Sequence, residues 1–169
     1  VWIILNDPPM LNLPRANSKI NWVEPNNILF SWTGRHRSSP NAAFSTSYIF
    51  RLVELPPNAS AQQGDWTMMG NAAFLNQPAL YEFKTEQSQL LYGPGEPALI
   101  PGRKYAWQVQ AVDEEGRDLF KNQGRSEVFV FQYGDAMGIP ENVRQELANA
   151  TTLSLRWDPP MAGEMPNQY

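Results

Sequence analysis

The sequence predicts an all-β protein built as an antiparallel sandwich, and three observations lead to that fold class. Almost every apolar stretch alternates with a period of two residues, which is typical of half-buried strands. These stretches are rich in aromatic and β-branched residues, and Pro, Gly, Asn and Asp separate them. The 15 prolines and 11 glycines are spread along the chain, as in proteins of many short strands and turns.

The first half of the chain contains two clear strand patterns. In residues 28–34, one face is aromatic and aliphatic and carries Ile28, Phe30 and Trp32. In residues 46–55, both faces are largely apolar, with Tyr48, Phe50 and Leu52 opposite Ile49, Arg51 and Val53. We therefore expect a strand in each range, the second one covered on both sides.

Two further strands are expected in the second half. Residues 104–112 alternate so that Tyr105, Trp107, Val109 and Ala111 point inward. Gln108 and Gln110 lie between them and are expected to be ordinary solvent-facing residues. Residues 126–133 form the last strand pattern, with Phe129, Phe131 and Tyr133 on one side.

The end of the chain repeats a pattern from its beginning. Residues 141–150 contain good helix formers, but the alternation of Leu153, Leu155 and Trp157 follows immediately. This reproduces the apolar–x–apolar–x–Trp pattern before Trp32, and both copies follow a Pro-containing segment. Because a lone pair of strands is marginal in water, we expect the second copy either to pack against neighbouring protein or to be an incomplete domain.

Trp32 at the end of one strand, an aromatic-rich strand after it, and the motif L-x-P-G-x-x-Y together resemble fibronectin type III domains. The motif residues are Leu99, Pro101, Gly102 and Tyr105. The resemblance implies an immunoglobulin-like sandwich of seven strands in two sheets, with Trp32 in its core. It also implies that the Tyr105 hydroxyl bonds to backbone a few residues upstream, as a tyrosine corner. Trp107 and, in the second copy, Trp157 complete this signature.

The expected domain organisation follows from the repeat and the resemblance. Residues 1–8 end a preceding unit or linker, and residues 9–134 form the first fibronectin type III-like domain. Residues 135–139 are a linker, and 140–169 supply the first strands of a second, incomplete domain. Because residue 1 is Val, we expect an internal piece of a longer chain, with short linkers that favour semi-rigid stacking.

An insertion at about 56–98 departs from the family pattern, which needs only one or two short strands there. We expect strands at 79–84 and 89–93, and a structured segment at 58–78, because its apolar content is too high for a flexible loop. Four of its apolar residues are interaction candidates: Trp66, Met68, Met69 and Phe74. They form either an exposed patch at a protein interface or a second small core.

Composition and motifs give little support to an enzyme. The chain has no cysteine and one histidine, His36, which we expect to be exposed to solvent. The acids Asp113, Glu114, Glu115 and Asp118 lack the ligand spacing of a calcium loop, and we expect a solvated loop. We expect no catalytic, cofactor-binding or metal-binding residues. The net charge of −4 argues against nucleic acid, and no apolar run is long enough to span a membrane.

Residues 105–134 also resemble repeats of very large surface and secreted proteins of Bacteroidota, bacteria with type IX secretion and gliding motility. This resemblance implies an extracellular or cell-surface location, or the periplasmic face of the outer membrane. It also implies protein partners there, in an outer-membrane secretion or gliding complex, beside the neighbouring domains of the same chain.

The sequence therefore predicts a non-catalytic structural and interaction module of a large multidomain cell-surface or secreted protein. An alternative is a carbohydrate-binding or accessory module of a secreted glycosidase, which would need Trp66, Tyr81 and Tyr92 exposed in one plane. A subunit of a secretion or motility complex, held along its edge strands, is a third hypothesis.

Overall fold

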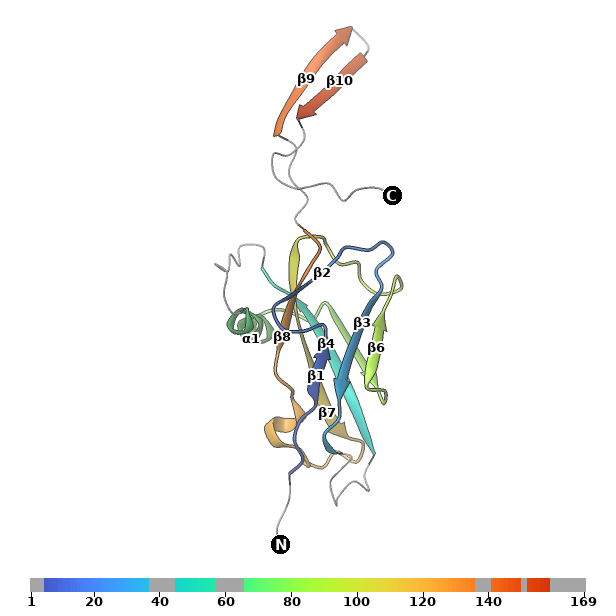
Figure 1. The fold of residues 1–169 in the computed structure, drawn as a ribbon, viewed down its shortest axis with the longest axis vertical. Helices are drawn as coiled ribbons and strands as arrows, with labels where there is room; N and C mark the ends of the chain where they lie inside the picture. The colour runs from blue at the N-terminus through green and yellow to red at the C-terminus, as the bar shows by residue number, and fades with distance from the viewer. Residues whose placement is uncertain (1–4, 37–44, 57–65, 136–140, 150–151, 159–169) are drawn as a thin grey trace. The chain divides into compact units, whose positions relative to one another are not determined.

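The computed structural model describes residues 5–36, 45–56, 66–135, 141–149 and 152–158, the last two ranges as backbone only. The chain divides into two compact units, Val1–Asp135 and Ala136–Tyr169, which are described separately. The described residues of the first unit form a two-sheet β-sandwich with one short α-helix (Figure 1). The prediction of an all-β sandwich is therefore confirmed.

The smaller sheet of the first unit has three antiparallel strands. In order they are β1 (Met10–Leu13), β3 (Ile28–Thr33) and β6 (Gln89–Tyr92). In β3, the inward residues are buried and the outward ones are partly or largely exposed, as the alternation predicts. The strand at β6 lies within the predicted insertion.

The larger sheet has five strands in the order β2-β8-β7-β4-β5. Their bounds are β2 (Ser18–Ile20), β8 (Phe129–Tyr133), β7 (Arg103–Asp113), β4 (Thr46–Glu54) and β5 (Tyr81–Thr85). The short β2 runs parallel to β8, and the other pairs are antiparallel. The long pairing of β4 with β7 forms the middle of this sheet.

Aromatic side chains from both sheets fill the core between them. The ring of Phe30 lies 4.8 Å from Phe50 and 5.1 Å from Trp107, measured between centroids, in edge-to-face geometry. Such pairs contribute about 0.5–1.5 kcal/mol beyond the burial of their area. Among the described residues, the fully buried aromatic side chains are Phe30, Tyr48, Phe50, Tyr92, Tyr105, Trp107, Phe131 and Tyr133.

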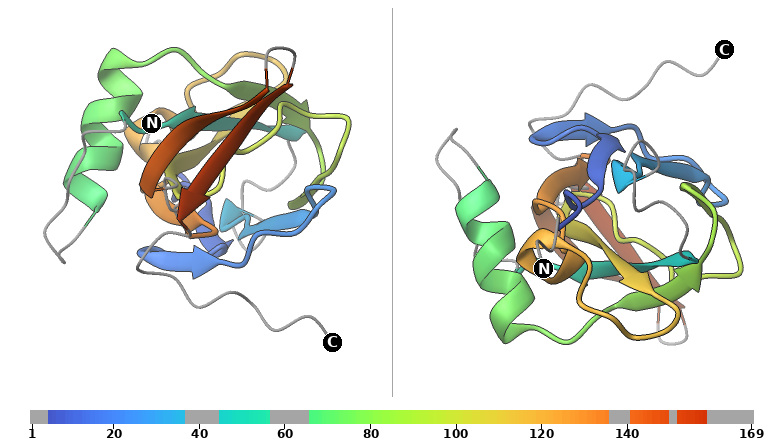
Figure 2. Two further views of the ribbon diagram at one scale, coloured as in Figure 1. Left: turned by 90° about the horizontal axis from the view of Figure 1, so that it is seen from above. Right: turned by 90° about the horizontal axis from the view of Figure 1, so that it is seen from below.

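Helix α1 (Thr67–Asn76) lies outside the two sheets, against the larger one (Figure 2). Beneath it, Ala73 joins a second buried cluster with Val53, Leu55, Ala106, Val128 and Val130. Those strand residues alternate with the residues that fill the main core, so β4, β7 and β8 are covered on both faces there. No helix in the described part of the chain is long and apolar enough to cross a membrane.

The second unit contains an antiparallel hairpin of β9 (Glu141–Asn149) and β10 (Thr152–Asp158). Residues 141–149 thus form a strand despite their helix-forming composition. The side chain of Trp157, the linker residues 136–139 and residues 159–169 lie outside what the structure describes.

Candidate functional site

The stretch with the most chemistry-bearing residues, 99–118, begins with a fastened turn. The Tyr105 hydroxyl accepts a hydrogen bond from the Ile100 N–H at 2.8 Å. Gly102 adopts a positive φ of 81°, and its N–H donates to the Tyr133 carbonyl at 2.7 Å. Leu99 is buried and Pro101 is half-buried. This is the corner contact that the fibronectin type III resemblance implies, and it uses the phenol for folding.

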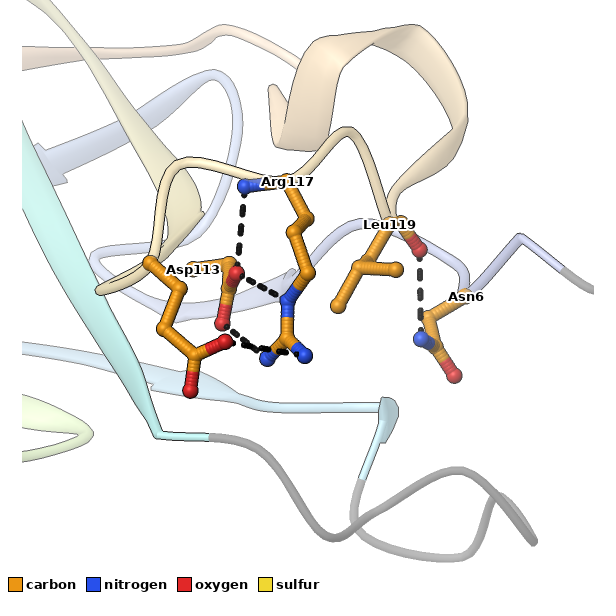
Figure 3. A network of polar contacts seen from close by, with 5 residues as sticks. Asn6, Asp113, Arg117 and Leu119 are labelled. Atoms are coloured by element: carbon orange, nitrogen blue, oxygen red, sulfur yellow. Dashed lines mark hydrogen bonds and ion pairs between the residues drawn. The ribbon is translucent and has the colours of Figure 1, made fainter.

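The acid loop after β7 is built around a buried carboxylate (Figure 3). Asp113 accepts hydrogen bonds from Arg117, at 2.7 Å from Nε and 3.1 Å from the backbone N–H. These contacts hold the pKa of Asp113 below its ordinary value, against the opposing effect of desolvation. The expectation of a solvated loop is therefore wrong for Asp113, whose side chain organises the loop. Glu114, Glu115 and Asp118 are exposed.

The same loop holds the segment that leads into β1. Asn6 N–H donates to the Leu119 carbonyl at 2.8 Å, and Lys121 N–H donates to the Asn6 carbonyl at 2.9 Å. The Asn6 side chain adds a bond to the Leu119 carbonyl at 3.1 Å (Figure 3). An ion pair joins Lys121 to Asp7 at 2.9 Å. These hydrogen bonds and the ion pair thus fix the chain in place where it enters the sandwich.

His36 corrects a second expectation. It is 7% exposed, not solvent-facing. Its ring centroid lies 5.9 Å from that of Phe120 and 6.3 Å from that of Tyr48. After β3 the chain turns inward, and His36 closes one end of the aromatic core. The polar residues next to His36 in the sequence do not reveal this burial.

The structure divides the four interaction candidates in the insertion. Trp66, Met69 and Phe74 are half-buried and pack on the second cluster. Lys104 Nζ lies 5.0 Å from the Trp66 ring centroid. Met68 is 81% exposed on the outer side of α1. The second-core alternative therefore accounts for three of the four residues, and the exposed-patch alternative for Met68.

A cavity of about 440 Å³ lies between α1 and the outer face of the larger sheet. Its lining residues come from four elements and one loop: Ile49, Arg51, Asn71, Phe74, Leu75, Glu82, Gln108, Gln110, Arg125 and Val128. The larger sheet thus presents a hollowed, partly charged surface where α1 leaves it uncovered. Among the features described, this cavity is the best candidate for a binding site.

Two glutamines of β7 are fixed within this lining. Gln108 Nε2 donates to the Ser126 carbonyl at 2.9 Å, and Gln110 Nε2 donates to the Gln123 carbonyl at 2.9 Å. Both are half-buried. The expectation of ordinary solvent residues is therefore wrong, because the segment before β8 folds back along β7 and takes up their amide groups.

That segment contains a strained turn. Asn122, Gln123 and Gly124 are consecutive residues with positive φ angles of 50°, 54° and 76°. Left-handed backbone is uncommon for residues other than glycine. At position 124 even a Cβ would collide with the Ala111 carbonyl oxygen. The turn delivers Arg125 to the edge of the cavity.

The aromatic platform of the carbohydrate alternative is not formed by its three residues. Tyr92 is fully buried, and its hydroxyl donates to the Pro97 carbonyl at 2.5 Å. The rings of Tyr81 and Tyr92 are nearly perpendicular, with an interplanar angle of 86°. A flat sugar-stacking surface needs exposed rings in one plane, which Trp66, Tyr81 and Tyr92 do not supply. No group of three or more metal-ligating side chains is present among the residues that the structure describes.

Comparisons with known proteins give likenesses to solved structures alone. No protein-family model and no curated protein matches the chain. Among solved structures, the chain is similar to α-L-rhamnosidase from Dictyoglumus thermophilum, at 16% sequence identity and a TM-score of 0.45. The match covers 88% of this chain and 16% of the rhamnosidase, so the chain spans a small part of that protein's length.

Proposed function

We propose that the first unit is a fibronectin type III-like domain that acts as a non-catalytic structural link and interaction module in a multidomain protein. The observation that carries the proposal is where the chain enters and leaves this unit. It enters beside the loop that follows β7, through Asn6, and leaves beside the start of β7, where Arg103 pairs with Tyr133. The two points therefore lie toward opposite ends of β7.

Their separation suits an element of a linear array. β7 has 11 residues, so at a rise of about 3.3 Å per residue it is about 33 Å long. The exit is fastened like the entrance: Gly134 N–H donates to the Ile20 carbonyl at 2.7 Å, and Lys19 forms an ion pair with Asp135. Because the chain is held at both ends of the unit, the unit keeps a fixed distance between the points where its neighbours attach.

Strand arrangement supports the fibronectin type III assignment within this proposal. The described residues of the first unit form eight strands by hydrogen bonding, in sheets of three and five. β1 and β2 are short consecutive strands that lie in different sheets. Counted as one strand that switches sheets, they bring the total to the seven that the family implies. The Tyr105–Ile100 contact supports the same assignment.

We further propose that the protein is located at the cell surface or at the periplasmic face of the outer membrane. Its partners there would belong to a secretion or gliding complex. The support is the resemblance of residues 105–134 to surface repeats of Bacteroidota. A further support is that β5 and β6 lie at sheet edges, since an edge strand offers unpaired backbone groups to a partner chain.

Affinity isolation of the full-length protein from its native cells tests the proposal. After chemical cross-linking and cell fractionation, mass spectrometry should find it in the outer-membrane fraction, joined to other proteins of that membrane. Recovery as a lone soluble protein, with no cross-linked partner, would contradict the interaction role.

A further inference from the structure

We propose that the cavity between α1 and the larger sheet is a docking groove for an extended, acidic segment of a partner protein. In this assignment, Arg51 and Arg125 bind a carboxylate of that segment. The inference deepens the proposed function and rests on it, because it assigns partner chemistry to one surface of the interaction module.

The charges in the groove oppose those of the whole chain. The protein has a net charge of −4, yet two arginines and one glutamate line the cavity. Within the described part of the chain, neither Arg51 nor Arg125 has a carboxylate partner. Glu82 is the cross-strand neighbour of Arg51 but forms no ion pair with it. Because the planar guanidinium group binds carboxylates with paired hydrogen bonds, the groove favours an acidic occupant.

Arg51 is held in place but is not saturated with hydrogen bonds. Its guanidinium carbon lies 5.4 Å from the Phe74 ring centroid, in a cation–π contact. Its Nε is buried and has no hydrogen-bond partner among the described residues. A buried polar group without a partner is destabilising. A carboxylate that binds the rest of the guanidinium group would do so at small cost in side-chain entropy, since the side chain is already packed.

Arg125 is held through its backbone. Its N–H donates to the Asn122 carbonyl at 3.0 Å, and its own carbonyl accepts from Asn122 Nδ2 at 2.9 Å. It also forms a β-bridge with Gln110. The side chain itself is exposed. The backbone contacts of the strained turn thus position Arg125 at the edge of the groove. Its cationic side chain has no ion-pair partner among the described residues.

The helix lines the groove with two apolar residues, Phe74 and Leu75, and with the polar Asn71. Leu75 lines the cavity and is 86% exposed, beside the half-buried Phe74. α1 has no charged residue, and Met68 is exposed on its outer side. A helix that is apolar on several sides is typical of a covered position. The occupant is therefore expected to carry apolar side chains next to its carboxylate.

The hollow continues beyond Arg125, which favours an extended segment over a compact ligand. A second cavity of about 800 Å³ shares Asn71, Gln108, Arg125 and Val128 with the first. It adds Arg35 and Glu127 to the charged lining. An acidic polysaccharide also offers carboxylates along an extended chain, but the apolar Phe74 and Leu75 in the lining suit a peptide better.

Peptide selection against the folded chain tests the docking groove. A displayed library of random octapeptides would be selected on the protein and counter-selected on the R51Q/R125Q double variant. Affinities of the selected peptides, and of polygalacturonate as the polysaccharide arm, would then be measured by fluorescence anisotropy and calorimetry. Single variants R51Q and R125Q would be compared with R15Q, which removes an exposed arginine outside both cavities.

We expect selected peptides enriched in Asp or Glu beside apolar residues, at least tenfold weaker on R51Q and on R125Q and unchanged on R15Q. Binding should also weaken when Leu75 is replaced by Ser. If R51Q loses its cooperative melting, R125Q, whose side chain is exposed, decides the outcome. Selection without acidic enrichment, equal binding to R125Q, or arginine-dependent binding of polygalacturonate alone would overturn the proposal. The distance between the points where the chain enters and leaves the first unit does not depend on these arginines, so failure here leaves the linking role testable separately.

Discussion

Three buried tyrosines fasten loops at the level of single residues. Tyr105 receives the Ile100 N–H at 2.8 Å, and Tyr92 donates to the Pro97 carbonyl at 2.5 Å. Tyr133 donates to the Val23 carbonyl at 2.8 Å. The ring of each tyrosine fills the core, and its hydroxyl forms a hydrogen bond with a loop backbone group. These hydroxyls, which in the sequence suggest a functional site, therefore have a structural role.

Replacement of Tyr105 by Phe should lower the free energy of unfolding by about 1–3 kcal/mol, because the hydrogen bond between the Ile100 N–H and the buried tyrosine is lost. Urea denaturation of the wild-type protein and Y105F measures the difference. Y81F is the matched control, since the Tyr81 hydroxyl has no hydrogen bond among the described residues and its loss should change stability little. An unchanged unfolding midpoint for Y105F would refute the structural role of this hydroxyl.

Buried phenols also predict a loss of stability at high pH. Burial raises the pKa of Tyr105 to about 12, from an ordinary value of 10.0. The pKa of Tyr92 is raised too, mainly by desolvation. Above pH 10 the unfolded chain releases these protons while the folded chain keeps them, so unfolding becomes more favourable as pH rises towards 12. Denaturant melts from pH 8 to 12 should show this fall, with a smaller slope in Y105F. A flat profile would contradict the burial of these hydroxyls.

At the level of elements, β4, β7 and β8 are covered on both faces. The main core lies on one side of these strands and α1 lies on the other. Gly70 permits this coverage, because a Cβ there would lie 2.5 Å from Val130 Cγ2 and 3.0 Å from Val128 Cγ1. The helix therefore approaches the sheet as closely as a backbone without a side chain allows.

Gly70→Ala weighs helix propensity against packing. Alanine gains about 1 kcal/mol in a helix interior. Overpacking a stiff, buried valine costs about 1–3 kcal/mol, so we expect a net destabilisation of about 1 kcal/mol. Thermal and urea unfolding measure the change, with M68A on the outer side of the same helix as the control, which should change stability little because Met68 is 81% exposed. Stabilisation by G70A would show that α1 does not press on the sheet as described.

Periodicity predicted most strands of the first unit, but not the short β1 and β2 or the helix. β3, β4, β7 and β8 lie where alternation placed them, and β5 and β6 lie in the two segments of the insertion expected to be strands. The sequence did not predict α1, because this helix carries apolar residues on both its inner and outer sides, lacks a side-chain cap at Trp66 and contains no charged residue. Without an amphipathic stripe, its sequence offers no signal of period 3.6.

At the level of the whole molecule, the candidate site was less predictable than the fold. The signature residues Trp32, Tyr105 and Trp107 could be identified from local patterns. The groove could not, because Arg51, Glu82 and Arg125 come from different elements and look like ordinary surface charges in the sequence. His36 and Asp113 were misjudged for the same reason: their burial depends on segments that are distant along the chain.

The distance between the two points where the chain enters and leaves the first unit tests the linking role most directly. Because the chain has no cysteine, L5C and D135C introduce unique sites for spin labels. Pulsed dipolar spectroscopy should give one narrow distribution centred near about 30 Å or beyond, set by the length of β7. The pair L5C and D118C, which lies at one end, should give a much shorter distance. A distribution for L5C and D135C centred below about 20 Å, or one as broad as that of an unfolded chain, would contradict the account.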